Sequence, residues 1–355
     1  MPMTILTIVG ARPQFIKCAP VSREIRKHFK EVILHTGQHY DYNMSQGFFD
    51  ELAIPEPDYN LGIGSDTHGA QTGLMLIEIE KVLLREKPDL VLVYGDTNST
   101  LAGALAASKL HLPVAHIEAG LRSFNRKMPE EINRIVADKL SRFLFVPTQT
   151  AVRNLVREGQ TDGVYNVGDV MFDSFLFNLA RLDQTKVLKK FQLQPKEFIL
   201  ATVHRPQNTD NPNVLKELIS ALEHLHEPTI FPIHPRTRNL IEKYNIQVHE
   251  GSVRLVEPVS YQEMIALEKN ARVILTDSGG VQKEAYFAGV PAIVLRGETE
   301  WVELVENGWA FLIGDDFQKI SGLLSRRIAK KSSSKALFGD GQASRKIVSV
   351  LSTEM

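Results

Sequence analysis

The sequence has one cysteine, no long apolar run and almost no net charge, and each shortage excludes a class of protein. Cys18 stands alone among 355 residues, which excludes an internal disulfide and a cysteine-based zinc cluster. The formal net charge is -1, which gives no basis for a general nucleic-acid or membrane surface. No stretch approaches the roughly 20 apolar residues of a membrane span. We therefore expect a cytoplasmic protein with a small-molecule partner, and neither nucleic acid nor membrane as a partner.

Motifs for metal and dinucleotide binding are also absent. The sequence has no HExxH, no Cys/His ligand set and no GxGxxG after its first β-rich run, and the glycines of GIGSDTHG have the wrong spacing. It lacks the GxSxG of a nucleophile elbow, so a serine triad built from Ser278, His204 and Asp96 would be arbitrary. We predict no bound metal and no cofactor.

The chain is long enough, and at 43% apolar content rich enough in core-forming residues, for two domains. Short β-rich runs alternate with amphipathic helical segments, a pattern typical of parallel sheets. We predict an α/β protein with two Rossmann-like domains, residues 1–180 and 181–355, and a cleft between them. The last amphipathic segment, about 336–352, is a candidate to cross back onto the first domain. The β-rich runs are 4–10, 32–36, 90–95, 113–119 and 142–147, then 198–204, 229–234, 253–259, 272–278 and 291–296.

The motif GARPQFIK follows the first β-rich run and is a candidate phosphate site. Ligands of open α/β sheets bind beyond the carboxyl ends of the strands. Gly10 permits a tight turn there, Arg12 is a fixed cation, and Lys17 stands at the opening of a helix. This arrangement suits a pyrophosphate. An ordinary turn with solvated basic side chains remains the alternative.

A second phosphate candidate follows the run that ends near residue 276. Ser278, Gly279 and Gly280 precede a helix, so unhindered backbone amides meet the positive helix terminus. Glu284 lies one turn into that helix and is placed to accept hydrogen bonds from ribose hydroxyls. An ordinary Ser/Gly helix cap is the alternative. One phosphate candidate in each domain is what a nucleotide sugar in the cleft needs.

Carboxylates form a further group in the first domain. Asp96 in GDTNST and Glu118 in HIEAGLR follow buried β-rich runs, where a carboxylate is costly unless it meets a partner, water or substrate. Both are therefore candidate site residues. The alternatives are a cap contact to the helix that begins near Asn98 for Asp96, and an ion pair with Arg122 for Glu118.

The adjacent Glu130 and Glu131 in MPEEINR have a stronger alternative. A proline at the first helical position followed by acids is ordinary chemistry for the start of a helix. Spacing alone leaves the choice between catalysis and helix capping even.

Two pairs of a histidine and a cation follow β-rich runs of the second domain. His204 and Arg205 lie in ATVHRPQN, and His234 and Arg236 lie in FPIHPRTR, at equivalent positions of successive runs. Such pairs suggest contacts to a diphosphate and a sugar. Packed or surface histidines are the alternative, which the equivalence of the two positions weakens.

Together these motifs resemble those of the non-hydrolysing UDP-N-acetylglucosamine 2-epimerase family. The matches cover nearly the whole chain in family order: GARPQFIK, TGQHYD, GDTNST, HIEAGLR, MPEEINR, HRPQN, HPRT and TDSGGVQKE. The resemblance implies a GT-B-like fold and a UDP-sugar substrate. By it, the catalytic carboxylates are Asp96, Glu118 and Glu131, and the nucleotide contacts are Arg12, His204, His234, Ser278, Gly279, Gly280 and Glu284. We add His204 to the catalytic set, and Lys17, Gln14, Arg205 and Arg236 to the substrate-binding set.

Two positions depart from the pattern of the family. Many members carry an acid where this chain has Gln14, and GARPQ with TGQHYD is more similar to the branch that contains epimerases of UDP-2,3-diacetamido-glucuronate, used in bacterial surface polysaccharides. A neutral amide beside Arg12 removes the repulsion that a fixed carboxylate exerts on an anionic sugar. Many relatives carry an arginine where this chain has Tyr40, so allosteric activation by substrate is not carried over.

An epimerase of this kind can work without NAD or metal. The hydrogen on carbon 2 is not next to a carbonyl, and transient oxidation would need the dinucleotide motif that is absent. If UDP leaves carbon 1 while cations hold its charge, a carboxylate can take the carbon-2 proton, and a glycal results. UDP then re-adds while a proton arrives from the other face. We predict this reaction on a UDP-N-acetylhexosamine, either UDP-GlcNAc to UDP-ManNAc or the 2,3-diacetamido-glucuronate analogue.

Three other activities share parts of this pattern. A GT-B glycosyltransferase has the same fold and nucleotide site but passes the sugar to an acceptor. A hydrolysing 2-epimerase lets water intercept the glycal, and a non-catalytic sensor of nucleotide sugars needs no carboxylates. The three carboxylates of the first domain favour the epimerase. We expect it to act as a homodimer.

Overall fold

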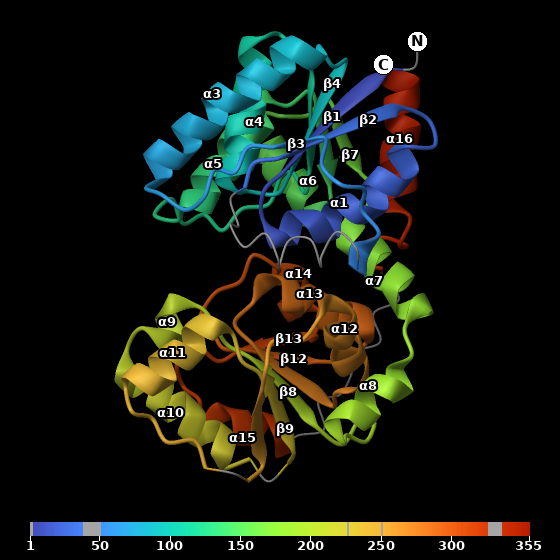
Figure 1. Cartoon of the computed structure of the whole chain (residues 1–355). Coiled ribbons are helices and arrows are strands. Elements are labelled where there is room, and N and C mark those ends of the chain that lie inside the picture. The colour runs from blue at the N-terminus through green and yellow to red at the C-terminus, as the bar shows by residue number, and fades with distance from the viewer. Residues whose placement is uncertain (1–2, 38–50, 226, 250, 326–335) are drawn as a thin grey trace. The chain divides into compact units, whose positions relative to one another are not determined.

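The computed structural model describes residues 3–37, 51–225, 227–249, 251–325 and 336–355 (Figure 1). The chain divides into two compact units, Met1–Leu176 with Ala336–Met355, and Phe177–Lys335. Each unit is built around one parallel β-sheet, which confirms the predicted α/β class with two Rossmann-like domains. In TGQHYD the described residues end at Gly37, so Tyr40 lies outside them.

The first unit holds a seven-stranded sheet in the order β3-β2-β1-β4-β5-β6-β7, with every pair parallel. This is the dinucleotide-fold order 3-2-1-4-5-6 with one strand added. Five strands fall on the predicted β-rich runs. The two-residue β3 has no apolar run to reveal it. The strands are β1 (Thr4–Val9), β2 (Lys30–His35), β3 (Tyr59–Asn60), β4 (Leu90–Tyr94), β5 (Val114–Ile117), β6 (Phe143–Val146) and β7 (Val164–Asn166).

Helices cover both faces of the first sheet (Figure 1). On one face α3, α4 and α5 share a core with Leu6 and Ile8 of β1, whose side chains alternate with those pointing to the other face. On the other face α1 packs beside α16. The helices of this unit are α1 (Arg12–Ile25), α3 (His68–Glu86), α4 (Asn98–Lys109), α5 (Pro129–Leu140), α6 (Gln149–Arg157), the first half of α7 (Val170–Arg181), and α16 (Ala343–Glu354).

The last helix belongs to the first unit. The chain leaves this unit within α7 and rejoins it at residue 336. Asp173 on α7 holds the start of α16, because its carboxylate accepts from the backbone amides of Ala343 at 3.0 Å and Ser344 at 2.8 Å. The two units are thus Met1–Leu176 with Ala336–Met355 and Phe177–Lys335, where the predicted ranges were 1–180 and 181–355 with the segment 336–352 as a candidate to cross back.

The second unit repeats the architecture with a six-stranded parallel sheet in the order β10-β9-β8-β11-β12-β13. Helices α10, α11 and α15 share one apolar core with this sheet. The strands are β8 (Ile199–Thr202), β9 (Thr229–Pro232), β10 (Val253–Val256), β11 (Val273–Thr276), β12 (Ala292–Val294) and β13 (Ala310–Leu312). The helices are α8 (Gln184–Phe191), α9 (Pro206–Thr209), α10 (Pro212–Glu223), α11 (Pro235–Lys243), α12 (Tyr261–Asn270), α13 (Gly279–Ala288), α14 (Val302–Glu306) and α15 (Lys319–Ser325).

Each sheet has a point where the strand order reverses, between β1 and β4 in the first unit and between β8 and β11 in the second. Ligands of open α/β sheets bind at such a point, beyond the carboxyl ends of the strands. The loops there are 10–11 and 95–97 in the first unit, and 203–205 and 277–278 in the second. The candidate residues of the sequence analysis gather in and around these loops.

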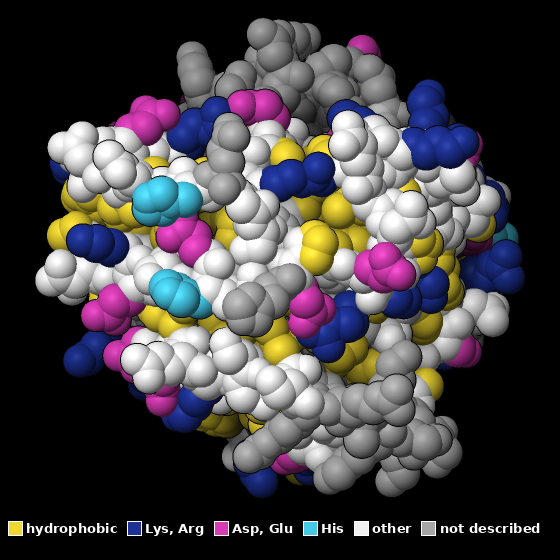
Figure 2. Space-filling model, turned by 90° about the horizontal axis from the view of Figure 1, so that it is seen from below, with side chains coloured by type: hydrophobic (Ala, Val, Ile, Leu, Met, Phe, Trp, Pro, Cys, Tyr) yellow, Lys and Arg dark blue, Asp and Glu magenta, His cyan; other side chains and the backbone are white. Residues whose placement is uncertain are grey.

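The surface carries mixed charge where it is visible from below (Figure 2). On that face Lys and Arg side chains alternate with Asp and Glu, without a broad area of one sign. This agrees with the net charge of -1. Within the described ranges, no helix combines the length and the apolar character that crossing a membrane requires.

Candidate active site

Gly10 ends β1 at a point of close packing. A Cβ at this position would lie 2.1 Å from Thr36 Oγ1 and 2.3 Å from Ser99 Oγ. These two hydroxyls are hydrogen-bonded to each other at 2.8 Å, so a side chain at Gly10 would push them apart. The close packing of Thr36 and Ser99 against the backbone therefore requires a glycine at position 10. Arg12 follows as the first residue of α1 and is half-buried.

Gln14 points into the first unit and is buried there. Its Oε1 accepts from the backbone amides of Gly10 at 2.8 Å and Ala11 at 3.0 Å. Its Nε2 donates to Tyr94 O at 2.9 Å and to Thr100 Oγ1 at 3.1 Å. The amide thus ties the loop after β1 to the end of β4. Both ends of this side chain are therefore engaged within the first unit, and a direct contact of Gln14 with the sugar stays a prediction.

Gln14→Glu is therefore expected to destabilise the fold more than it changes sugar preference. A carboxylate keeps the two bonds from the loop amides, but it can donate neither to Tyr94 O nor to Thr100 Oγ1, whose own hydrogen is already donated to Tyr94 O. Each lost bond of this buried kind costs about 1–3 kcal/mol. Chemical denaturation of wild type and variant measures the loss. An unchanged denaturation midpoint combined with an altered sugar preference would contradict this expectation and support a direct contact between Gln14 and the sugar.

Lys17 on α1 pairs with Glu118 from the loop after β5, across 101 positions of sequence. Gly95 gives the pair its space, because a Cβ there would lie 3.1 Å from Lys17 Nζ and 3.3 Å from Glu118 Oε2. The φ of Gly95 is +62°, a value that also favours glycine. The alternative partner for Glu118 was wrong, since Arg122 instead pairs with Asp138 on α5.

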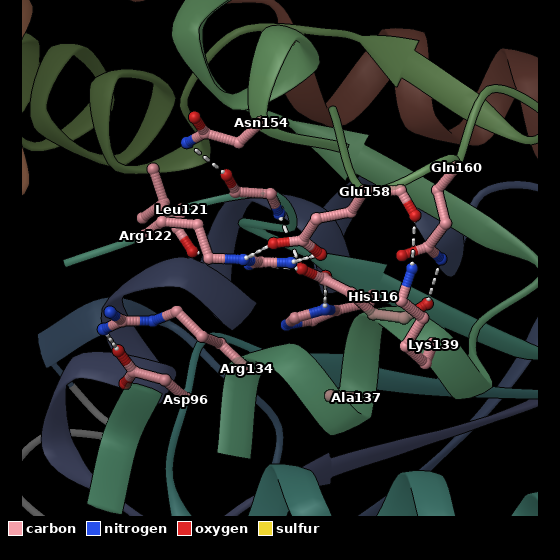
Figure 3. Close-up of polar contacts among 12 residues, drawn as sticks. Asp96, His116, Leu121, Arg122, Arg134, Ala137, Lys139, Asn154, Glu158 and Gln160 are labelled. Carbon is pink, nitrogen blue, oxygen red and sulfur yellow. Dashed lines mark hydrogen bonds and ion pairs between the residues drawn. The ribbon is translucent and has the colours of Figure 1, made fainter. Parts of the chain in front are cut away.

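Arg134 on α5 joins the other two candidate carboxylates, and Figure 3 shows its contact with Asp96. Its Nη2 pairs with Asp96 Oδ2, and its Nη1 donates to Glu131 Oε2 at 2.5 Å. Burial alone would lower the pKa of Arg134. The two carboxylates raise it by more than burial lowers it, so the net shift of the pKa is upward. Asp96 does not cap α4 as the alternative had it, because the cap is Thr97, whose Oγ1 accepts from Thr100 N.

Glu131 is held by the loop that precedes its own helix. Its carboxylate accepts from Ser123 N at 2.9 Å, Ser123 Oγ at 3.0 Å and Phe124 N at 2.9 Å, as well as from Arg134. Burial raises the pKa of Glu131, but these hydrogen bonds and Arg134 outweigh it and lower the pKa below its usual value. Glu131 is thus ionised at neutral pH, while the adjacent Glu130 is exposed.

The three carboxylates differ in how far solvent reaches them. The Asp96 side chain is 32% exposed, that of Glu118 is 9% exposed and that of Glu131 is 1% exposed. With Lys17 and Arg134 they form a group of three carboxylates and two cations beside the loops of the first switch point. Ionised carboxylates held by cations can accept a proton and return it. Asp96 is the one that a ligand reaches most directly.

Asp277 organises the site of the second unit. It is fully buried after β11, and its carboxylate accepts from the backbone amides of His204 at 3.1 Å and Arg205 at 3.0 Å. The Nδ1 of His204 lies 3.3 Å from Asp277 Oδ1. Asp277 therefore fixes the loop after β8 against the loop after β11. Asp277 was not among the predicted site residues, although it directly follows a buried strand, the same signal that identified Asp96.

His204 and His234 lie together, with ring centroids 5.8 Å apart. Arg236 supports them from α11, because its guanidinium donates to His204 O at 3.2 Å and to Thr209 Oγ1 at 2.8 Å and pairs with Asp210. The structure thus brings the two predicted histidine-plus-cation pairs to one place. Arg236 thus contacts both the loop after β8 and the end of α9.

The predicted Ser-Gly-Gly phosphate site begins α13. Ser278 is its N-cap, with Oγ accepting from Val281 N, and Gly279 and Gly280 are the first two helical residues. All three are half-buried. A Cβ on Gly279 would approach nothing closer than 3.6 Å, so this glycine keeps the backbone accessible. Such a helix start binds an anionic group.

Glu284 lies further into α13 and is buried against α12. Burial and the charge of Glu284 raise the pKa of the neighbouring Glu268 well above its usual value. Glu284, which was predicted to accept hydrogen bonds from ribose, therefore lies beside a second carboxyl group, that of Glu268, inside the second unit. In the part of the chain that the structure describes, no cluster of three or more His, Cys, Asp or Glu side chains could hold a metal ion.

The two parallel sheets, with charged and glycine-rich loops at both switch points, define a GT-B-like α/β protein with two nucleotide-binding-type domains. The family model for UDP-N-acetylglucosamine 2-epimerase matches residues 23–352. The chain belongs to this family of isomerases, which confirms the resemblance drawn from its motifs.

Individual relatives match over nearly the whole chain. A UDP-N-acetylglucosamine 2-epimerase homolog of Methanococcus maripaludis is 56% identical, over 98% of this chain and 99% of its own. The UDP-2,3-diacetamido-2,3-dideoxy-D-glucuronate 2-epimerase of Pseudomonas aeruginosa is 51% identical over the same shares. The crystal structure of Methanocaldococcus jannaschii UDP-GlcNAc 2-epimerase with UDP-GlcNAc and UDP is similar with a TM-score of 0.91, at 46% identity, covering 99% of this chain and 100% of that one.

Proposed function

We propose that the protein inverts carbon 2 of a UDP-N-acetylhexosamine by elimination and re-addition of UDP, without a cofactor. The observation that carries the proposal is the group of three carboxylates and two cations at the first switch point. A glycosyltransferase or a sensor of nucleotide sugars has no need of three such carboxylates. The family to which the chain belongs supports the same reaction.

The UDP part of the substrate is assigned to the second unit and to Arg12. The start of α13 offers half-buried amides and a positive helix terminus to a diphosphate, which carries at least two negative charges. The paired histidines and Arg205 supply further donors beside it. Gln14 and Arg236 act through the loops that they contact. The proposed substrate-binding set comprises Arg12, Lys17, Gln14, Arg205, His234, Arg236, Ser278, Gly279, Gly280 and Glu284.

The sugar part is assigned to the carboxylates. In the first half-reaction the bond between carbon 1 and the diphosphate oxygen breaks, a carboxylate takes the proton from carbon 2, and its electron pair forms the double bond of a glycal. In the second half-reaction the diphosphate oxygen re-forms its bond to carbon 1 while a proton reaches carbon 2 from the opposite face. Asp96 and Glu118 are proposed as proton carriers, with Glu131 as the third catalytic carboxylate and His204 beside the leaving diphosphate.

Product analysis tests the proposal. Proton NMR of purified protein with UDP-GlcNAc, and in parallel with UDP-2,3-diacetamido-glucuronate, should show one of them converted to a UDP-linked 2-epimer with no free sugar. Release of free N-acetylmannosamine and UDP would instead indicate a hydrolysing epimerase. An unchanged spectrum with both nucleotide sugars would contradict the proposal. Since relatives with both names match closely, the side-by-side comparison also identifies the sugar.

We further infer that the protein is a cytoplasmic homodimer that serves surface polysaccharide synthesis. The single cysteine supports a reducing compartment.

Apolar side chains at Leu74, Ile77 and Leu84 of α3 are about half exposed and share one helix face. A second copy can cover this stripe with its own. Light scattering should give twice the chain mass of 39.9 kDa, and the mass of one chain would contradict the dimer.

A further inference from the structure

A buried histidine lies directly beneath the two proposed proton carriers. His116 on β5 has no exposed surface. Its Nε2 lies 2.7 Å from Gly95 O, the carbonyl that precedes Asp96. Because a carbonyl oxygen only accepts hydrogen bonds, Nε2 must carry a hydrogen. The ring is thus bonded to the loop that presents Asp96.

The other ring nitrogen also faces an acceptor. His116 Nδ1 lies 2.7 Å from Asp138 Oδ1, and the carboxylate of Asp138 accepts in addition from Gly120 N at 3.1 Å and Arg122 Nη1 at 2.7 Å. The charge-assisted bond from Arg122 and the bond from the Gly120 amide favour the ionised form of Asp138. With Asp138 ionised, Nδ1 donates to it and carries a hydrogen.

The charges of the surrounding cluster agree with a doubly protonated ring. Asp138 and Arg122 lie in the interior, and Arg122 also forms two bonds to Glu158, at 2.7 and 2.8 Å (Figure 3). One arginine cannot balance two buried or half-buried carboxylates. An imidazolium at His116 brings the cluster to a net charge of zero, which a low-dielectric interior favours.

The cluster also fixes the loop that carries Glu118. Glu118 has a φ of +70°, a left-handed conformation that residues other than glycine rarely adopt. Its amide donates to Phe145 O at 3.0 Å, and two residues later the Gly120 amide donates to Asp138 and the Gly120 carbonyl accepts from Asn154. Surrounding contacts of this kind are what keep a strained residue in place at a functional site.

We propose that His116 is a positioning residue whose imidazolium joins the loop of Asp96 to the loop of Glu118 and so sets the spacing of the two carboxylates. The inference rests on the proposed function, because it takes these carboxylates to be the proton carriers. It adds that the ring stays charged throughout the reaction and exchanges no proton with the substrate. Misplacement of reacting groups by about 1 Å can cost about a hundredfold in rate.

Two substitutions separate the bonds of the ring. In His116→Gln the side-chain amide nitrogen can stand in for Nε2 and keep the bond to Gly95 O, whereas in His116→Asn it can stand in for Nδ1 and keep the bond to Asp138. If both bonds are needed, each variant should lower kcat about 10- to 100-fold, while KM and the affinity for UDP change less than about threefold. Wild-type kcat in either variant would overturn the inference.

Histidine NMR on the wild-type protein tests the charge without any substitution. With nitrogen-15 histidine at pH 8, the His116 signal, assigned by through-bond correlation of the ring to its own backbone, should show hydrogens on both ring nitrogens. His35 is an internal reference, because its Nδ1 accepts from Gly37 N at 2.7 Å and so carries no hydrogen. One unprotonated nitrogen in His116 would overturn the inference even if both variants failed to fold.

Parallel assays of Asp96→Asn and Glu118→Gln distinguish the two levels of the account. If these lose turnover while the His116 variants keep it, the positioning role is wrong and the proposed function stands. If Asp96→Asn and Glu118→Gln keep turnover, the proposed proton carriers are wrong, and the positioning role falls with them.

Discussion

Asp96→Asn is expected to lower kcat about a thousandfold, the middle of the range for loss of a general acid or base. Asp96 is the most exposed of the three carboxylates, and asparagine preserves its size while removing its ability to take a proton. In its ion pair with Arg134 the aspartate side chain is 32% and the arginine side chain 6% exposed, so the free energy of unfolding should fall by about 1–3 kcal/mol. Steady-state kinetics and chemical denaturation measure the two effects separately.

Asp162→Asn is the matched control, because Asp162 is an exposed aspartate of the same unit, in the turn before β7. It should leave both kcat and stability at the wild-type values. A near-normal kcat in Asp96→Asn, with wild-type product, would remove Asp96 from the chemistry and leave it the role of holding Arg134.

Glu131→Gln is expected to lower kcat at least about a hundredfold and also to destabilise the protein. The helix-capping alternative for Glu131 involves little burial, since it needs only an acid in the first turn of α5. The structure predicts the destabilisation, because an amide nitrogen would replace an oxygen that accepts from Ser123, Phe124 or Arg134 in the interior. A buried donor left without its acceptor costs about 1–3 kcal/mol. Kinetics should be measured well below the melting temperature of the variant.

Glu130→Gln is the control for Glu131, since it makes the same change one position away on an exposed side chain. It should alter neither rate nor melting temperature. If Glu131→Gln lowers the melting temperature but keeps near-normal turnover and UDP binding, Glu131 holds the 123–124 loop and takes no part in the chemistry.

The fold was largely predictable because its strands are buried on both faces and therefore appear as continuous apolar runs. Runs such as 90–95 and 272–278 become central strands of the two sheets. The position of candidate residues directly after these runs then placed them near the switch points. The short β3 escaped prediction because its two residues form no such run.

The partners of the site residues were not predictable from spacing, because they come from distant parts of the chain. The Lys17–Glu118 pair joins α1 to the loop after β5, and the inward orientation of Gln14 depends on the carbonyl of Tyr94. Arg134 was closer to prediction, since it follows Glu131 by three residues on the same helix, a spacing at which side chains meet. Its second partner became visible only in the fold.

The reaction itself is tested most directly by isotope exchange at carbon 2. The protein is incubated in heavy water with the nucleotide sugar that it converts, and the epimerised product is analysed by proton NMR and mass spectrometry. Elimination and re-addition predicts deuterium at carbon 2 of the product, because the proton taken by a carboxylate exchanges with solvent before another is returned from the opposite face. Product that retains its original hydrogen at carbon 2 in every molecule would contradict the account.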